Sequence, residues 1–206
     1  MIHMPKSYSI PSAIVLAAGE GSRIGKPKAI LEINGRFFIE RVIDTLILAG
    51  IDNITVVLGA EADKIKSMTD LSIVNTVINE NYTNGQFSSL QAGLSNLKAE
   101  GDLIVFPVDH PLVEPDTVMQ LLDSATEPSN TKAVVPVFNG KKGHPVLLTK
   151  SMVRKVQKAA NGETLRDILW NHPSAVKQIG VDDPGILQNI DTVEDYQGLI
   201  LKASEN

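Results

Sequence analysis

The chain has 206 residues, 43% of them hydrophobic and 21% charged, a balance that predicts one globular domain and excludes wholesale disorder. The absence of cysteine excludes disulfides, thiolate zinc sites and cysteine nucleophiles, and it is typical of the reducing cytoplasm, where we expect this protein. The formal net charge of −5 argues against nucleic acid as a partner, so a bound anion must be held by a local cluster of donors or by a metal.

The first half of the chain alternates predicted strands with predicted helices. We expect a single domain over residues 1–206, with residues 1–10 flexible, and neither a signal-peptide core nor a membrane-spanning run is present. Short apolar runs at 13–17, 54–58 and 73–78 predict strands. Apolar residues recur every three or four positions from Phe38 to Ala49, which predicts a helix that Gly50 ends. A polar loop over 79–86 precedes a predicted helix over 88–97.

The second half of the chain continues this alternation. A predicted strand over 103–108 runs directly into Asp109, and Pro111 prevents the strand from continuing. Pro115 suits the first turn of a helix, which a polar connection over 124–132 follows. Two strands, 133–138 and 145–148, flank a glycine-rich turn, which predicts a hairpin and a mixed sheet. Predicted helices over 151–160 and 164–170, edge strands near 176–179 and 186–190, and a last helix from Thr192 complete the chain. The pattern predicts an α/β fold: a three-layer sandwich around a mostly parallel mixed sheet.

A glycine-rich segment with three cations follows the first predicted strand. It reads Leu16-Ala17-Ala18-Gly19-Glu20-Gly21-Ser22-Arg23-Ile24-Gly25-Lys26-Pro27-Lys28. Glycines at the carboxyl end of a strand let backbone N–H groups approach phosphate oxygens, and arginine and lysine neutralise the charge of a polyphosphate. The segment is therefore a predicted cradle for a triphosphate, with an ordinary solvated surface loop as the alternative.

Two better-known phosphate loops do not fit this segment. A Walker A loop needs Gly-Lys-Ser/Thr opening a helix, whereas Lys26-Pro27-Lys28 leads into an extended-looking stretch. A dinucleotide loop needs Gly-x-Gly-x-x-Gly, and Gly25 lies one residue too late for that spacing. The spacing therefore disfavours a dinucleotide-dependent dehydrogenase.

Two aspartates stand at the ends of predicted strands. Asp109 follows the strand over 103–108, and Asp191 follows the predicted edge strand over 186–190. Each can reach the carboxyl edge of the sheet, and two carboxylates are a sufficient protein contribution to a Mg²⁺ site. Each also has a structural alternative: Asp109 as a turn residue before proline, and Asp191 as part of a capping box with Glu194 at the start of the last helix. We assign no chemistry to His110, which we expect to be solvent-facing or structural.

Five segments in order resemble one known family. They are the glycine-rich segment, 85–93 (Gly-Gln-Phe-Ser-Ser-Leu-Gln-Ala-Gly), 107–111 (Pro-Val-Asp-His-Pro), 143–145 (Gly-His-Pro) and 189–196 (Asn-Ile-Asp-Thr-Val-Glu-Asp-Tyr). Together they resemble the molybdenum-cofactor cytidylyltransferase-like nucleotidyltransferases of the nucleotide-diphospho-sugar transferase superfamily, and the resemblance extends over nearly the whole chain. It implies transfer of a nucleoside monophosphate from its triphosphate to a phosphorylated acceptor, with release of pyrophosphate.

The resemblance also assigns roles to residues at matching positions. Catalytic roles fall on Arg23, Lys28 and Asp109, and Asp109 and Asp191 are the implied Mg²⁺ ligands. Acceptor-binding positions are Gly143, His144 and Pro145, with an ordinary hairpin histidine as the alternative for His144. Nucleotide-binding positions are Leu16, Ala17, Ala18, Gly19, Gly21, Ser22, Arg23, Lys28, Ser88, Ser89 and Gly93. Ser88 and Ser89 have an equal alternative as N-caps of the helix that follows them.

Substrate identity follows from finer features of the resemblance. Ala18 matches the cytidylyltransferase branch of the family, whereas the guanylyltransferase branch typically has a second glycine at this position. The resemblance therefore favours CTP. The acceptor is expected to be a molybdopterin-type cofactor, with a sugar phosphate or phosphocholine-type acceptor as the runner-up. The segment 162–167 keeps only the glycine, the acid and the arginine of the family's Gly-Asp-x-Gly-Ala-Arg pattern, a departure near the acceptor pocket. A binding or insertion chaperone for molybdoenzymes, without turnover, is the alternative of another class.

Overall fold

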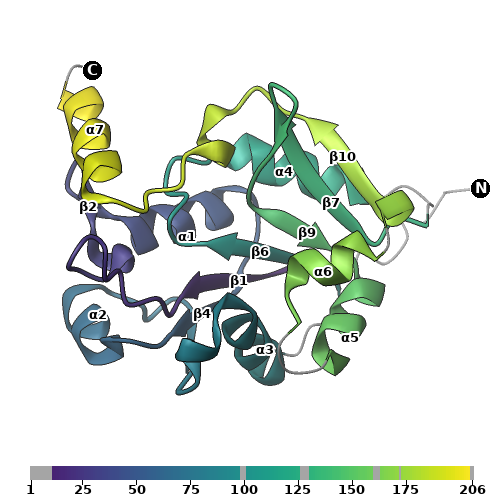
Figure 1. The fold of residues 1–206 in the computed structure, drawn as a ribbon, viewed down its shortest axis with the longest axis horizontal. Helices are drawn as coiled ribbons and strands as arrows, with labels where there is room; N and C mark the ends of the chain where they lie inside the picture. Colours follow the sequence, from purple (N-terminus) through teal and green to yellow (C-terminus); the bar gives the residue numbers. More distant parts are fainter. Residues whose placement is uncertain (1–10, 98–100, 126–129, 160–162, 172, 205–206) are drawn as a thin grey trace, which may run out of the picture.

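The computed structural model describes residues 11–97, 101–125, 130–159, 163–171 and 173–204. Within them an eight-stranded sheet has the strand order β10-β7-β9-β6-β1-β4-β5, with β8 paired to β7 (Figure 1). The strands of this sheet are β1 (Ser12–Ala17), β4 (Asn53–Leu58), β5 (Asn75–Ile78), β6 (Leu103–Pro107), β7 (Ala133–Phe138), β8 (Lys141–Lys142), β9 (Val146–Leu148) and β10 (Val176–Gly180). Only β8 and β9 run antiparallel to their neighbours. The predicted mostly parallel mixed sheet is confirmed.

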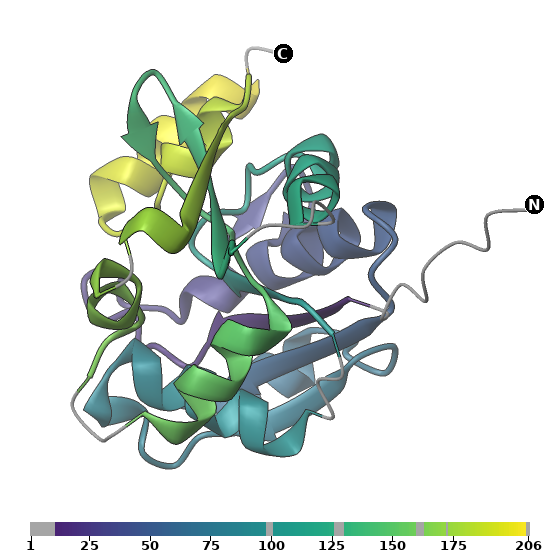
Figure 2. The same cartoon turned by 90° about the vertical axis from the view of Figure 1, so that its right-hand side faces the viewer.

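Helices cover both faces of the sheet (Figures 1 and 2). One face packs against α1 (Phe38–Leu48), α2 (Ala62–Met68), α4 (Pro115–Ala125) and α7 (Val193–Ser204). The other face packs against α3 (Gln86–Asn96), α5 (Lys150–Lys158) and α6 (Leu165–Trp170). Successive residues of a strand point to opposite faces, so in β1 Val15 joins the first core and Ile14 the second. Both sides of β1 are therefore buried, which explains its continuous apolar sequence.

The central parallel strands end together. In the register of β1 with its neighbours, Leu16 lies opposite Pro107 of β6, and Ala17 opposite Leu58 of β4. The backbone N–H of Val108 extends this pairing by donating to the carbonyl oxygen of Leu16 at 3.1 Å. Figure 1 shows the arrows of β1 and β6 pointing to the same end of the molecule. The loops that carry the glycine-rich segment and Asp109 therefore leave the sheet at one edge.

The predicted antiparallel pairing of the two strands is confirmed, but the tight turn joins β7 to the short strand β8, which lies inside the predicted turn. Phe138 and Lys141 are paired across a two-residue turn in which Asn139 and Gly140 have φ values of +49° and +75°. Asparagine and glycine tolerate a left-handed backbone at both central positions, as this type of turn requires. The predicted strand over 145–148 corresponds to β9, which pairs with both β6 and β7 and so joins the two halves of the sheet.

One predicted strand is wrong. Residues 184–187 form a 3-10 helix, η4 (Pro184–Leu187), and not an edge strand over 186–190. The carboxylate of Asp183 accepts a hydrogen bond from the N–H of Gly185 at 2.8 Å and so caps this turn, with Pro184 at its first position. Ile186 and Ile190 are buried against the core, which explains an apolar run that resembles a strand.

Smaller differences concern element ends and short elements. The strand β5 begins at Asn75, two residues later than predicted, and Ile73 is 66% exposed. Two elements were not predicted from the sequence: α2, and the two-stranded ribbon of β2 (Glu32–Ile33) and β3 (Arg36–Phe37). Position 160, the predicted end of the helix that is observed as α5, and Gly162 lie outside the described residues.

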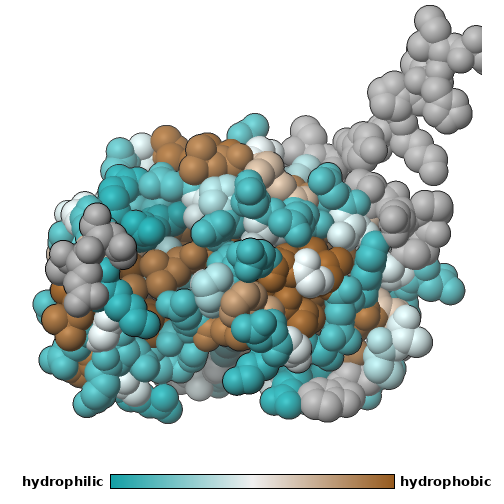
Figure 3. All heavy atoms as spheres, turned by 90° about the horizontal axis from the view of Figure 1, so that it is seen from above, coloured by the Kyte–Doolittle hydropathy of each residue, from teal (hydrophilic) through white to brown (hydrophobic). Residues whose placement is uncertain are grey.

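Membrane-spanning helices are absent from the described part of the chain. None of its helices combines the length and the apolar character needed to cross a bilayer. On the face seen from above, apolar residues form separate patches between hydrophilic side chains (Figure 3).

Candidate active site

Two adjoining pockets open where β1 and β6 end. The first, which we call the loop pocket, has a volume of about 250 Å³, and the second, the wide pocket, about 770 Å³. They share a wall formed by Leu16, Gly85, Gln86 and Pro107. The remaining lining of the loop pocket is Ala17, Ala18, Gly19, Gly21, Lys28, Ala29, Tyr82, Ser89, Val108 and Asp109. A ligand in the loop pocket is therefore adjacent to a ligand in the wide pocket.

The glycine-rich segment folds back on itself at the loop pocket. Gly21 has a φ of +62°, and its carbonyl oxygen accepts hydrogen bonds from the N–H groups of Ile24 and Gly25 at 2.9 and 3.0 Å. A Cβ atom at position 21 would lie 2.0 Å from the carbonyl oxygen of Lys26. Only glycine fits this position, because it needs both a left-handed backbone and the space of the missing side chain.

Lys28 connects two aspartates that are distant in the sequence. Its Nζ atom lies 3.1 Å from Oδ2 of Asp109 and also contacts Oδ1 of Asp191. The three side chains are partly buried, with 19%, 21% and 35% of the Lys28, Asp109 and Asp191 side chains exposed. The structure thus brings together three residues that the sequence analysis placed in one site.

Asp191 does not follow a strand. A backbone hydrogen bond of the residue before it holds it at this position. The N–H of Ile190 donates to the carbonyl oxygen of Asp109 at 2.9 Å, which fixes the two segments side by side. The capping-box alternative required Asp191 and Glu194 to cap α7. The observed cap is formed one residue later, by Thr192 and Asp195. The hydroxyl of Thr192 accepts from the N–H of Asp195 at 3.1 Å, and the Asp195 carboxylate accepts from the N–H of Thr192 at 2.9 Å. The capping-box alternative for the Asp191 side chain is therefore wrong, and that carboxylate faces Lys28.

Asp109 is held in its ionised form. Burial by itself raises the pKa of this carboxyl group, but the hydrogen bond and charge of His110 and the charge of Lys28 outweigh burial and lower the pKa to about 2. Nδ1 of His110 lies 2.8 Å from Oδ1 of Asp109. His110 is only 7% exposed, so the expectation of a solvent-facing histidine is wrong, whereas that of a structural one agrees with its burial.

The donor set at Asp109 and Asp191 fits a magnesium ion. Two carboxylate oxygens from separate segments converge on one positive charge, the Lys28 ammonium group. Across the described ranges, no cluster of three or more His, Cys, Asp or Glu residues could hold a metal ion. Calcium and structural zinc sites need more protein ligands, whereas magnesium is held by one or two carboxylates together with substrate phosphates and water.

The predicted nucleotide-binding residues divide into two groups. Those that line the loop pocket are Leu16, Ala17, Ala18, Gly19, Gly21, Lys28 and Ser89. Ser22 and Arg23 are exposed on the same loop and do not line the pocket. Gly93 packs against the sheet, where a Cβ atom would lie 2.9 Å from side-chain atoms of Ile14 and Val57, so its packing accounts for glycine there.

Ser88 and Ser89 do not cap the helix. The N-cap of α3 is Gly85, and both serine hydroxyls accept hydrogen bonds from the side-chain amide of Asn79, at 2.9 and 3.0 Å. The N-cap alternative is therefore wrong. Asn79 is 5% exposed and was not singled out from the sequence, because an asparagine between a strand and a polar loop gives no signal beyond that of a turn residue.

The predicted acceptor-binding residues border the wide pocket. Gly143 and His144 line it, and Pro145 is buried next to them in a cis peptide bond. A Cβ atom at Gly143 would lie 2.3 Å from the carbonyl oxygen of Ile186, so the backbone passes too close for a side chain. The rings of His144 and His110 pack edge to face, 4.9 Å apart. His144 therefore connects the wall of the wide pocket to the histidine that holds Asp109.

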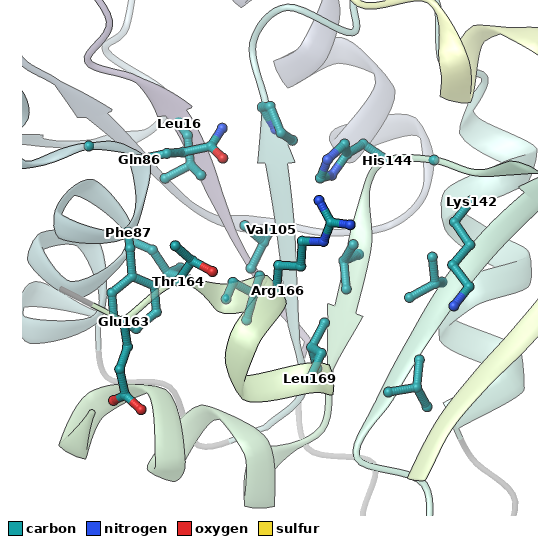
Figure 4. Close-up of a pocket in the computed structure, with 18 of the residues that line it drawn as sticks. Leu16, Gln86, Phe87, Val105, Lys142, His144, Glu163, Thr164, Arg166 and Leu169 are labelled. Carbon is teal, nitrogen blue, oxygen red and sulfur yellow. The ribbon is translucent and has the colours of Figure 1, made fainter. Parts of the chain in front are cut away.

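Charged and polar side chains surround an apolar floor in the wide pocket. Figure 4 shows Arg166 extending from α6 into the pocket and pointing toward His144. Lys142, from β8, lies on the other side of the pocket. Arg166 and Glu163 come from the segment that departs from the family pattern, and Gln86 comes from the second matching segment. All three lie in segments that the sequence already singled out. The lining is Asn84, Phe87, Leu90, Val105, Val135, Lys142, Gly143, His144, Val146, Glu163, Thr164, Leu165, Arg166, Leu169, Pro173, Val176 and Gln178, with the shared wall.

We predict that His144 makes the stability of the protein dependent on pH. Burial, and secondarily the nearby His110, lowers the pKa of His144 to about 4 from 6.5. The stability that its neutral form contributes is present above pH 6.5 and is lost as the pH falls toward 4. Between pH 7 and 5 this loss is about 1 to 2 kcal/mol. Urea unfolding should show it in the wild type and a smaller decrease in His144→Gln. Equal pH dependence of the two proteins would contradict the prediction.

Comparison with known proteins identifies the family of this site. A sequence profile of the MobA-like NTP transferase domain matches residues 13–176. Nicotine blue oxidoreductase of Paenarthrobacter nicotinovorans is 28% identical over 195 residues, which are 92% of this chain and 96% of that protein. The bifunctional protein GlmU of Clostridium kluyveri is 34% identical over 113 residues, which are 54% of this chain but 25% of GlmU, so the chain spans about a quarter of that relative.

Solved structures show the same fold. Rv0371c of Mycobacterium tuberculosis H37Rv has a TM-score of 0.81 and 22% identity, covering 95% of this chain and 100% of its own. That protein is also known in complex with manganese, with a TM-score of 0.76 and 20% identity over 93% of this chain and 98% of its own. The profile match covers well over half of the chain, and it confirms the resemblance seen in the glycine-rich segment and in the three motifs that follow it within residues 13–176. The chain belongs to the MobA-like NTP transferase family of nucleotidyltransferases.

Proposed function

We propose that the protein transfers CMP from CTP to a phosphorylated acceptor of molybdopterin type, in a Mg²⁺-dependent reaction that releases pyrophosphate. The observation that carries the proposal is the convergence of Lys28, Asp109 and Asp191 at the loop pocket, beside the glycine-rich segment. This arrangement supplies cations, hard oxygen ligands and backbone donors at one place, and the wide pocket leaves room for a second substrate next to it.

The proposed reaction needs no general base. The acceptor is a phosphate monoester, largely dianionic near neutral pH, and its oxygen attacks the α-phosphorus while the bond to pyrophosphate breaks. Magnesium bound by Asp109 and Asp191 would neutralise charge on the phosphate oxygens. Lys28 and Arg23 are the side chains proposed to stabilise the departing pyrophosphate, and the loop pocket holds the triphosphate in line with the acceptor.

The dimensions of the wide pocket favour a large acceptor. Its volume of about 770 Å³ lies in the range of pockets that enclose ligands of drug size. Its floor is apolar, with Val105, Val135 and Leu169, and it carries Lys142 and Arg166 as cations for acidic groups. A ring system with a phosphate suits this combination better than phosphocholine, which would leave most of the apolar wall in contact with water.

The narrow wall of the loop pocket favours a pyrimidine nucleotide. Ala18 is 4% exposed, and a Cβ atom at Gly59 would lie 2.8 Å from the Cβ of Ala18 and 2.8 Å from that of Tyr82. Gly59 therefore packs closely against Ala18 and Tyr82. The Ala18 methyl group takes space at this wall that a second glycine would leave open, which supports a small base and so CTP over GTP.

An oxidoreductase is the second candidate function, because the relative from Paenarthrobacter that matches 92% of the chain is named for that activity. The glycine spacing of the loop argues against a dinucleotide, and the Lys28, Asp109 and Asp191 site has no evident use in hydride transfer. A molybdoenzyme chaperone that binds the cofactor without turnover is the remaining alternative, with a molybdoenzyme as its partner.

Pyrophosphate release separates these candidates. The protein is incubated with Mg²⁺, each of the four nucleoside triphosphates, and molybdopterin, a sugar phosphate or phosphocholine. We expect pyrophosphate with CTP and molybdopterin, and none when Mg²⁺ is omitted. In a parallel incubation with NADH or NADPH and a dye as electron acceptor, oxidation of the dinucleotide without pyrophosphate release in the first assay would support the oxidoreductase. Tight binding of molybdopterin without either reaction would support the chaperone.

We predict that Gly21→Ala weakens CTP binding by about tenfold or more, because the added Cβ would be 2.0 Å from the Lys26 carbonyl oxygen and the loop must open. Gly25→Ala is the matched control: Gly25 has a φ of +75°, but no atom lies within 4 Å of the position that an added methyl group would occupy. Calorimetric titration of both variants with CTP measures the difference. Equal losses in the two variants would show that backbone strain, and not the contact with Lys26, controls the loop.

A further inference from the structure

Asn79 connects the loop after β5 to the start of α3 through its side chain. Its Oδ1 atom accepts a hydrogen bond from the backbone N–H of Asn81 at 3.0 Å. Its Nδ2 atom donates to the hydroxyls of Ser88 and Ser89 at 2.9 and 3.0 Å. Because the Asn81 N–H can only donate, it fixes the amide orientation, and the amide must present its two hydrogens to the serines.

The two serines differ in whether their hydroxyl hydrogens have an acceptor. Ser88 donates to the carbonyl oxygen of Asn81 or Gly85, at 3.0 or 2.8 Å, so its hydroxyl is satisfied as both donor and acceptor. Ser89 accepts from Asn79, and no described residue accepts its hydrogen. It is 3% exposed and lines the loop pocket. A buried hydroxyl hydrogen without an acceptor is costly, and an acceptor atom of a ligand would satisfy it.

We infer that Asn79 is a positioning residue that turns the Ser89 hydroxyl into a hydrogen-bond donor for the nucleobase. This rests on the proposed function, in which a nucleotide fills the loop pocket. The polarity follows from the order of the bonds: Asn79 donates, Ser89 must accept, and the Ser89 hydrogen is left for the ligand. The recognised group is a base edge that presents an acceptor, such as the carbonyl oxygen of a pyrimidine.

Asn79→Asp reverses this polarity with little change of shape. A carboxylate at position 79 accepts from the serine hydroxyls, so Ser89 would use its hydrogen there and present lone pairs to the base. We expect CTP to bind about tenfold more weakly to this variant. Binding of Mg²⁺-tripolyphosphate, which has the phosphates without the base, should change by less than about twofold, so a general loss of structure or added charge repulsion is distinguishable.

The matched control is Asn53→Asp. Asn53 also donates from its side-chain amide to a serine, Ser12, at 2.9 Å. It stands at the start of β4, whereas the pocket lies where that strand ends. CTP affinity should be unchanged in this variant. Ser89→Ala is the second comparison, and it should lose CTP affinity to a similar extent as Asn79→Asp.

Calorimetric titration of wild type, Asn79→Asp, Ser89→Ala and the double variant completes the test. If Asn79 acts through Ser89, adding Asn79→Asp to Ser89→Ala should cause no further loss of CTP affinity. Additive losses, or equal losses for CTP and tripolyphosphate, would overturn the inference while leaving the proposed function intact. A wild-type protein that binds tripolyphosphate but shows no added affinity for CTP would also overturn it. Failure of the wild type to bind either ligand would contradict the proposed function itself.

Discussion

Asp109→Asn is expected to lower the rate of pyrophosphate release about 100- to 1,000-fold. The substitution keeps the size of the side chain but removes the negative charge of the carboxylate that is proposed to bind Mg²⁺. An amide oxygen is a much weaker ligand for magnesium. The Asp109 carboxylate is ionised throughout the physiological range, since its pKa is lowered to about 2. Activity should not return when the pH is raised, because no titratable group remains at this position.

Two measurements make this prediction specific. Asp116→Asn changes the same charge on an exposed carboxylate in the first turn of α4, and it should leave turnover unchanged. Urea unfolding of Asp109→Asn should show a folded protein, so that lost activity reflects the site. Turnover above half of the wild-type rate in a folded Asp109→Asn would remove Asp109 from the proposed metal site.

Lys28→Met is expected to have opposite effects on catalysis and on metal binding. Loss of the cation next to the departing pyrophosphate should lower turnover about 100-fold or more. Without nucleotide, however, the Lys28 ammonium group lies between Asp109 and Asp191 and competes with a divalent ion for their oxygens. The variant should therefore bind free Mn²⁺ about tenfold more tightly than the wild type.

Electron paramagnetic resonance of Mn²⁺ measures that affinity without turnover. Lys26→Met is the matched control, because Lys26 is exposed on the same loop and forms no ion pair with either aspartate. Unchanged Mn²⁺ affinity in Lys28→Met would mean that the contact with the aspartates does not compete with metal. A lower affinity would mean that Lys28 organises the carboxylates for the ion.

Much of the fold was predictable because its signals are local. The run from Phe38 to Ala49 has the periodicity of a helix with one buried face, and Gly50 ends it with a φ of +83°. The strand β6 is a continuous apolar run that proline ends. The segment 186–190 shows the limit of such signals, because a buried 3-10 helix and its following loop have the same apolar composition as a short strand.

The composition of the site was predictable, but its connections were not. Lys28, Asp109 and Asp191 could be proposed from charge next to predicted strand ends, although the strand proposed before Asp191 is not formed. The contact between the backbones of Ile190 and Asp109, which brings the aspartates together, joins residues about eighty positions apart. No local pattern encodes such a contact. The burial of His110 and the bonds of Asn79 to the two serines depend in the same way on packing between elements.

A crystal structure of the protein with Mg²⁺ and a non-hydrolysable CTP analogue is the most direct test of the central claim. We predict one ion about 2.0 to 2.1 Å from carboxylate oxygens of Asp109 and Asp191, a triphosphate along the glycine-rich segment, and Lys28 moved from the aspartates to the phosphates. A nucleotide bound in another part of the protein, or an ion held without these aspartates while Lys28 still bridges them, would contradict it.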